Sequence, residues 1–364
     1  MRHKERVEKL LTLMRLHGID NFLITGKSDL MYFVGIDGPA ALLVSTKKNN
    51  NTLFVPPLSR HAAETYAPDF LEVVTTKMDE RFNVVVAESI GSIGGVTAVD
   101  EMSLEDYRFV SGLLASTELR PGMGIIWELR ELKDEYEVGA IRRACEVADR
   151  AMRSAYEILY PGITENEIKA EIVSEIYRSG GERLAFDVIV ASGPRTALPH
   201  GPLQRAEERD IPLREGDAVM IDLGAVVEGY HSDVTRTFFI GRPDTQFASA
   251  YEAVVAAKDA AEQYIKPETL CGYPDAVARN KLAEHALSEY FMHSLGHGVG
   301  LDIHEPPRMS PTSSEKLAAN MVLTCEPGVY IKDRWGIRVE DTLLVTERGP
   351  ERLTKFNYSE YIIT

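Results

Sequence analysis

The chain has 364 residues, of which 56 are acidic and 40 are basic, so its formal net charge is −16. A chain of this length can bury a sizeable core and suggests two domains. The acidic surplus argues against nucleic acid and against an anionic membrane surface as partners, because both attract clustered lysine and arginine.

The N-terminus and the cysteines indicate a cytoplasmic protein. The first residues, MRHKERVEK, are rich in charge and no small-residue cleavage site follows them, so we expect no signal peptide. Charged residues break the apolar run 250–265 and leave it short of the roughly 18 residues of a membrane span. Cys145, Cys271 and Cys325 are too few and too widely spaced for a disulfide framework.

The first 120 or so residues predict a compact α/β domain. Val7, Leu10, Leu11 and Met14 recur at the spacing of an amphipathic helix. Short apolar runs separated by turn residues then predict strands. These runs are 21–25, 40–46, 52–55, 72–76, 84–87 and 96–100.

The sequence becomes charged and helix-favouring after Arg120-Pro121-Gly122, so we place a domain boundary near residue 125. The predicted domains are therefore 1–125 and 126–364. The second domain is expected to be α+β, with helices covering one face of a largely antiparallel sheet. Its predicted helices are 127–159, 164–180, 246–265 and 273–290, and its predicted strands are 186–191, 217–225, 230–240, 321–332 and 337–346.

A diverged internal repeat is one interpretation of the second domain. Pro161-Gly162 opens a helix that leads to Asp222 in a strand pair, and Pro267 precedes a helix that leads to Glu326 in another. Two short matches can also arise by chance. A true repeat would mean two halves that each supply a carboxylate-bearing hairpin to a shared centre.

The first candidate hairpin carries Asp222 and Asp233 on either side of a turn at Glu228-Gly229. With that turn, Asp222 faces Thr235 across the hairpin and Asp233 lies on the same face, because strand side chains alternate. Asp222 also ends an apolar run, so a charged carboxylate there must be paired or metal-bound. A salt bridge, with Arg236 as one partner, is the plainer alternative.

A second candidate hairpin repeats this arrangement. Glu326 ends an apolar strand, while Arg338 and Glu340 lie two residues apart on the returning strand, and a turn near 333–336 brings that face toward Glu326. An ion pair between Arg338 and Glu326 is the alternative without a metal.

Six of the nine histidines lie between residues 200 and 304. His293, His297 and His304 fall in a glycine-rich stretch, HSLGHGVGLDIH, in which the chain can approach a centre closely. We expect His231 and His285 to be ordinary core or surface residues.

The donors in this region favour a hard or borderline cation. Four carboxylates and one imidazole carry too much negative charge for one divalent ion but suit two ions bridged by shared carboxylates. Carboxylate-rich sites accept Mn²⁺, Co²⁺, Zn²⁺ or Fe²⁺, so the donors do not select one metal; Mn²⁺ or Co²⁺ is the expectation here. Two such ions lower the pKa of a shared water and polarise the carbonyl that it attacks.

Five stretches of the sequence together resemble the pita-bread metallopeptidases, specifically the Xaa-Pro peptidases, which are prolidase and aminopeptidase P. The segment DNFLITGKSDLMYFVG (20–35) also resembles the start of the smaller creatinase-like N-terminal domain. The five stretches, in the order of that family, are IVASGPRTALPHG (189–201), DLGAVVEGYHSDVTRT (222–237), HSLGHGVGLDIHE (293–305), EPGVY (326–330) and GIRVED (336–341).

The resemblance implies a role for each matching residue. Five of them would ligate a dinuclear centre: Asp222, Asp233, His297, Glu326 and Glu340. Asp233 and Glu340 would bridge the two ions, and Glu326 would also pass a proton toward the leaving proline nitrogen. His200, His293 and His304 would bind substrate and stabilise the oxyanion, and Arg338 would anchor the substrate or orient Glu340.

The implied activity is hydrolysis of Xaa-Pro dipeptides by a homodimer. Aminopeptidase P, which acts on Xaa-Pro-Yaa peptides, remains the alternative enzyme. A binding protein that kept the fold without the chemistry is a further alternative, although no ligand position is substituted. Methionine aminopeptidase fits less well, because its relatives generally lack an N-terminal domain of this size.

Overall fold

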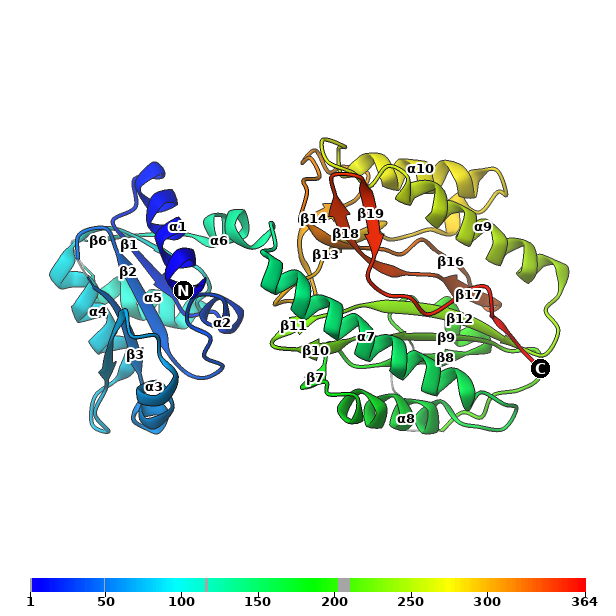
Figure 1. Cartoon of the computed structure of the whole chain (residues 1–364), viewed down its shortest axis with the longest axis horizontal. Coiled ribbons are helices and arrows are strands. Elements are labelled where there is room, and N and C mark those ends of the chain that lie inside the picture. Colours follow the sequence, from blue (N-terminus) through cyan, green and yellow to red (C-terminus); the bar gives the residue numbers. More distant parts are fainter. Residues whose placement is uncertain (1, 49, 115–116, 202–209) are drawn as a thin grey trace. The chain divides into compact units, whose positions relative to one another are not determined.

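The computed structural model describes residues 2–48, 50–114, 117–201 and 210–364 (Figure 1). The chain divides into two compact units, Met1–Arg130 and Glu131–Thr364. The domain limits 1–125 and 126–364 stay a prediction, and residue 125 itself lies within a helix, α6 (Met123–Arg130).

The N-terminal unit is a mixed sheet with helices. Its strands lie in the order β4-β3-β2-β1-β5-β6, with β1 antiparallel to β2 and parallel to β5. Leu23, Leu43 and Phe54 are buried in its core. The elements before α6 are α1 (Arg2–Leu16), β1 (Asn21–Ile24), α2 (Lys27–Val34), β2 (Ala41–Ser45), β3 (Asn51–Val55), η1 (Pro57–Ser59), α3 (Arg60–Tyr66), β4 (Leu71–Thr75), α4 (Phe82–Ile93), β5 (Gly95–Val99), α5 (Leu104–Leu113) and β6 (Thr117–Pro121).

One predicted strand of this unit is wrong. The sequence VVVA at 84–87 lies in helix α4, where Val86, Ala87 and Ile90 bury one face against the core. A run of four apolar residues does not distinguish a strand from a buried helical turn, and its β-branched residues favour the strand.

The second unit has two halves, each a sheet with a pair of helices. The first sheet has the order β20-β12-β9-β8 and packs with α7 and α8. The second has the order β14-β13-β15-β18-β19 and packs with α9 and α10. In Figure 1 the strands lie between α9 and α10 on one side and α8 on the other. This arrangement is what the internal repeat predicts.

The bounds of these elements follow. The first half contains α7 (Glu135–Glu157), α8 (Glu165–Arg178), β7 (Arg183–Leu184), β8 (Ile189–Ser192), η2 (Gly193–Ala197), β9 (Ala218–Leu223), β10 (Ala225–Val227), β11 (Tyr230–His231) and β12 (Val234–Ile240). The rest of the unit contains α9 (Thr245–Glu262), α10 (Gly272–Ala283), η4 (Ser288–Tyr290), β13 (Gly296–Gly298), β14 (Glu305–Met309), β15 (Val322–Cys325), β16 (Gly328–Ile331), β17 (Trp335–Arg338), β18 (Asp341–Thr346), β19 (Gly349–Arg352) and β20 (Ile362–Ile363).

The helical stretch predicted for 127–159 is two helices, α6 and α7. The side chain of Asp134 accepts the N–H of Glu137, and the Glu137 side chain accepts the N–H of Asp134. This reciprocal cap starts a new helix at Glu135. The helix predicted for 273–290 also ends early, at Ala283.

Among the helices in the described parts of the chain, none is both long enough and apolar enough to cross a membrane.

Candidate metal centre

The first carboxylate pair lies on the hairpin formed by β9 and β12. Asp222 is opposite Thr235 in the strand register, as the sequence predicts, and Asp233 immediately precedes β12. The predicted turn is also present, with positive φ at Glu228 (53°) and Gly229 (81°), as a two-residue type I′ turn requires. Asp222 and Asp233 are both buried.

The second carboxylate pair is joined to the first hairpin through Thr235. The N–H of Glu340 donates to the Thr235 carbonyl (3.1 Å), and the Thr235 hydroxyl donates to Glu340 Oε2 (2.6 Å). Arg338, at the end of β17, pairs with Asp222 (Nη2 to Oδ2, 2.5 Å) rather than with Glu326. Its Nε donates to the Thr235 hydroxyl (3.0 Å), so Arg338 orients Thr235 toward Glu340.

His297 presents a lone pair to these carboxylates. Its Nδ1 lies 3.1 Å from the Gly298 carbonyl, which can only accept, so Nδ1 carries the proton and Nε2 does not. Nε2 lies 3.6 Å from Asp233 Oδ2 and 3.4 Å from Glu326 Oε1. A Cβ at Gly296 would lie only 2.1 Å from the neighbouring strand's carbonyl oxygen, so only glycine allows β13 this close an approach.

A cavity of about 670 Å³ opens over this cluster. Every residue that the sequence singles out for the site lines it: His200, Asp222, Asp233, His293, His297, His304, Glu326, Arg338 and Glu340. Phe186, Ile189, Pro199 and Ile303 add an apolar wall to which the sequence assigned no role, although all but Phe186 lie within the quoted motifs. Such side chains carry no chemical signature, and only the fold brings them to the cavity.

The histidines of the region divide as expected. His200 and His304 are exposed at the cavity, and the His304 ring lies 4.4 Å from the His297 ring, centroid to centroid. His231 is buried outside the cavity lining, with its Nδ1 3.1 Å from the Gly300 carbonyl, and His285 is exposed.

Tyr330 is a site neighbour to which sequence reasoning assigned no role, although it belongs to the EPGVY motif. Arg338 Nη1 donates to its hydroxyl (2.8 Å), which lies 2.9 Å from His293 Nε2. Burial and then Arg338 lower the pKa of His293 to about 4, so the ring is neutral at pH 7. Its Nδ1 donates to the Ser294 carbonyl (2.9 Å), so Nε2 accepts from Tyr330 and both ring nitrogens are engaged.

The carboxylates of the cluster are short of positive charge. Burial, followed by repulsion from Glu340 and Asp222, holds the pKa of Asp233 well above its usual range. Burial does the same for Glu340, and it raises the pKa of Glu326 to about 7. Buried like charges are costly without a compensating cation, and the single charge of the buried Arg338 does not balance four carboxylates.

The donors present fit divalent metal ions. Ligand atoms of Asp233, His297 and Glu340 all lie within 4.8 Å of one another. Asp222 Oδ1 and Glu340 Oε1 are buried without a hydrogen-bond partner among the described residues. Oxygen atoms of this kind, beside an imidazole lone pair, are the ligands that Mn²⁺, Co²⁺, Fe²⁺ and Zn²⁺ accept.

The metal-free protein is expected to lose stability as the pH rises. Glu326 has a folded pKa of about 7, above its ordinary value of 4.5. The stability it contributes is therefore present below the ordinary value and is lost as the pH rises through the folded value. We expect the Tm of chelator-treated protein to fall between about pH 4.5 and pH 7, and added Mn²⁺ to raise Tm most at the higher pH. Thermal scans of a Glu326→Gln variant, which lacks this titration, should show a weaker pH dependence; an equal one would contradict the assignment.

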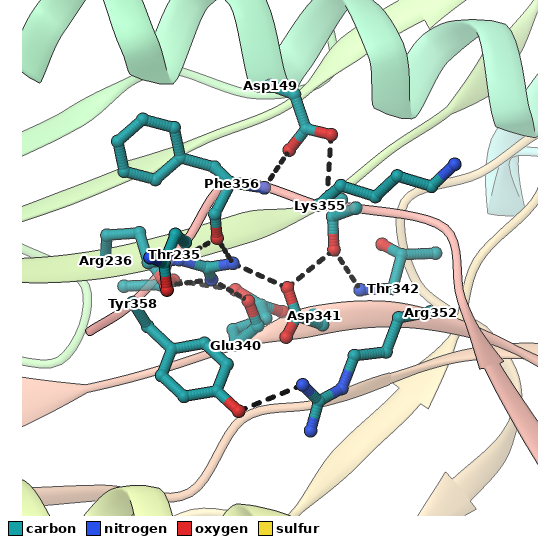
Figure 2. A network of polar contacts seen from close by, with 12 residues as sticks. Asp149, Thr235, Arg236, Glu340, Asp341, Thr342, Arg352, Lys355, Phe356 and Tyr358 are labelled. Carbon is teal, nitrogen blue, oxygen red and sulfur yellow. Dashed lines mark hydrogen bonds and ion pairs between the residues drawn. The ribbon is translucent and has the colours of Figure 1, made fainter. Parts of the chain in front are cut away.

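A buried network lies beside Glu340 (Figure 2). Arg236 donates to Asp341 Oδ1 (2.7 Å) and to the carbonyl oxygens of Glu340 and Phe356. Lys258 lies 2.5 Å from Asp341 Oδ2. Burial alone would raise the pKa of Asp341, but Arg236 and Lys258 lower it to about 2. Arg236 is therefore not the partner of Asp222 or Asp233 that the salt-bridge alternative proposed.

The fold and the cavity define a metal-dependent peptidase with a smaller α/β unit and a larger pita-bread unit. The chain belongs to metallopeptidase family M24, which it matches over residues 139–347, and residues 6–132 match the creatinase/prolidase N-terminal domain. These matches confirm the fold class and the family resemblance found in the sequence. Membership of a metallopeptidase family also implies divalent metal ions as cofactors.

Similar proteins cover nearly the whole chain. An Xaa-Pro dipeptidase of Pyrococcus horikoshii is 37% identical over 351 residues, which is 96% of this chain and 97% of the relative. A solved Xaa-Pro dipeptidase from Bacillus anthracis has a TM-score of 0.92 and 30% identity, covering 99% of this chain and 100% of that one. A solved X-Pro aminopeptidase from Thermotoga maritima has a TM-score of 0.86 and 32% identity, covering 96% and 99%.

Proposed function

We propose that the protein hydrolyses the bond between an N-terminal residue and proline, with dipeptides as the preferred substrates. The observation that carries this proposal is the convergence of four carboxylates and the His297 lone pair in one cavity. The similarity to an Xaa-Pro dipeptidase at 37% identity over nearly the full length supports the substrate class.

Two divalent ions would be held by Asp222, Asp233, His297, Glu326 and Glu340. The bound ions would polarise the scissile carbonyl and lower the pKa of the attacking water. Thr235 and the Gly298 carbonyl support this arrangement, because they fix the Glu340 carboxylate and the tautomer of His297.

The other cavity residues would act on the substrate. Glu326 would carry a proton toward the proline nitrogen as it leaves. His200 and His304, exposed at the cavity, would donate to the developing oxyanion. His293 would orient the substrate with its ring, since both of its nitrogens are engaged, and Arg338 would anchor the substrate or orient Glu340 through Thr235.

Release of proline from Met-Pro or Leu-Pro tests the proposed reaction. We expect turnover when the protein is purified with Mn²⁺ or Co²⁺, and loss of turnover after chelation that returns when the metal is restored. Absence of turnover with each of Mn²⁺, Co²⁺, Zn²⁺ and Fe²⁺, in protein that remains folded by circular dichroism, would reject the proposal.

Aminopeptidase P activity is the second candidate, supported by the similarity to the X-Pro aminopeptidase of Thermotoga maritima. The two activities differ in whether the peptide continues beyond proline. We expect Met-Pro to have a higher kcat/KM than Met-Pro-Leu when both are measured with the same metal. The reverse order would favour aminopeptidase P.

We further propose Mn²⁺ or Co²⁺ as the native metals, a homodimeric assembly and a cytoplasmic location. The oxygen-rich donor set supports these metals over a thiolate-bound ion. The three cysteines are buried and free, which suits a reducing compartment. Light scattering on the purified protein would measure the mass of the assembly against the 40.5 kDa of the chain.

A further inference from the structure

The backbone that leads into the metal centre is held by a charged pair on helix α10. Asp275 and Arg279 lie one helical turn apart, with Arg279 Nε 2.7 Å from Asp275 Oδ2. Arg279 donates through Nη1 to the Phe291 carbonyl (2.7 Å) and through Nη2 to the His293 carbonyl (2.6 Å). One guanidinium therefore fixes two carbonyls of the segment 291–295.

The burial of Asp275 and the ring beside Arg279 hold both side chains in place for these hydrogen bonds. Asp275 is fully buried, and the side chain of Arg279 is 25% exposed. The guanidinium also lies over the Phe291 ring, 4.3 Å from its centroid. The planar fork of arginine can bond a carboxylate and two carbonyls and still stack on a ring, whereas a lysine ammonium cannot.

The hydrogen bonds of Asp275 and Arg279 to residues 291–295 are called the clamp below. The segment that they hold contacts groups of the site. Asp275 Oδ1 shares the N–H of Leu295 (3.0 Å) with the Met309 carbonyl (2.8 Å). The Leu295 carbonyl accepts the N–H of Glu326 (2.8 Å). His293 lines the cavity between these contacts and accepts from Tyr330.

We propose that Asp275 and Arg279 are positioning residues that set the place of His293 in the cavity through the segment 291–295. The expected effect on kcat/KM rests on the proposed Xaa-Pro hydrolysis, whereas the hydrogen bonds of the clamp do not depend on it. Neither residue lines the cavity, so neither contacts the substrate directly.

Hydrogen exchange of the metal-loaded, full-length protein tests the clamp without reference to activity. An Arg279→Met variant should exchange faster across residues 288–295 than the parent, because two carbonyls lose their donor. The matched control is Arg142→Met on α7, which removes a bidentate partner of Glu351 and touches no cavity residue. It should leave exchange in 288–295 unchanged. Unchanged exchange in Arg279→Met would overturn the proposal.

A double-mutant cycle with His293→Ala tests the positioning role. Arg279→Met is expected to lower kcat/KM for Met-Pro about 10-fold in the parent, the scale of a lost supporting contact. In the His293→Ala background it should lower kcat/KM less, by no more than about twofold, because the group that it positions is gone. Bound Mn²⁺ per chain should stay at the parent value, and Arg279→Lys should recover thermal stability more fully than kcat/KM.

The outcomes separate the two proposals. Equal losses in both backgrounds would reject positioning through His293 while Xaa-Pro hydrolysis stands. A parent without Xaa-Pro turnover would reject the proposed function, and hydrogen exchange would then decide the clamp alone. An Asp275→Asn variant gives a second reading, because it keeps an acceptor for Leu295 but weakens the hold on Arg279; it should reproduce the faster exchange in a milder form.

Discussion

An Asp233→Asn variant is expected to lose Xaa-Pro hydrolysis by about 10³-fold or more, because metal ions contribute several kcal/mol to such transition states. Its metal-free form should nevertheless melt at a higher temperature than the metal-free parent at about pH 8. Burial and neighbouring carboxylates hold the pKa of Asp233 above its usual range, so the ionised carboxylate is costly until metal arrives. The neutral amide removes that cost.

Metal content, kcat/KM and Tm measured on the same preparations check this pair of effects. Glu252→Gln on α9 is a suitable control, since it removes one negative charge from an exposed position of the same unit. It should change none of the three measurements appreciably. The Tm difference between Asp233→Asn and the parent should also shrink as the pH falls, because the parent carboxylate then takes up its proton. Full metal binding and activity in Asp233→Asn would remove this residue from the centre.

The core of the site could be predicted because its geometry is local. The facing of Asp222 and Thr235 follows from a two-residue turn and the alternation of strand side chains. The contact between the two hairpins could not be predicted from turns and strand alternation. It depends on a hydrogen bond from Thr235 to Glu340 across 105 residues of sequence, and no periodicity encodes such a contact.

Errors in the predicted elements have equally specific causes. Residues 84–87 read as a strand because four apolar residues do not reveal their period, whereas Ile90, one turn further on, shows the helix. The break between α6 and α7 was visible as Asp134 and Glu137, a capping signal inside a charged stretch that otherwise favours one helix. The predicted salt bridge of Arg236 with Asp222 or Asp233 was wrong because Arg236 pairs with Asp341, which is 105 residues away in the sequence.

A Lys258→Met variant is expected to destabilise the second unit by about 3–5 kcal/mol, the cost of removing one partner from a buried ion pair. The Lys258 ammonium is fully buried and lies 2.5 Å from both Asp341 Oδ2 and Glu262 Oε1. Asp341 keeps Arg236 in the variant, but one of its buried oxygens loses its cation. Since the pKa of Asp341 is about 2 in the parent, the carboxylate is ionised at neutral pH, and Lys258 and Arg236 both stabilise its charge there.

Lys281→Met provides a matched comparison, because Lys281 pairs with Glu284 on an exposed surface. Its side chain and that of Glu284 are 36% and 58% exposed, against 0% and 8% for Lys258 and Glu262. Exposed pairs contribute about 0–1 kcal/mol, so this variant should unfold close to the parent. Urea unfolding can be followed by Trp335, which packs on Phe247, in a Trp127→Phe background that leaves no other tryptophan. A midpoint shift as small in Lys258→Met as in Lys281→Met would contradict this prediction. It would show that Arg236 alone is enough to stabilise the buried Asp341 carboxylate.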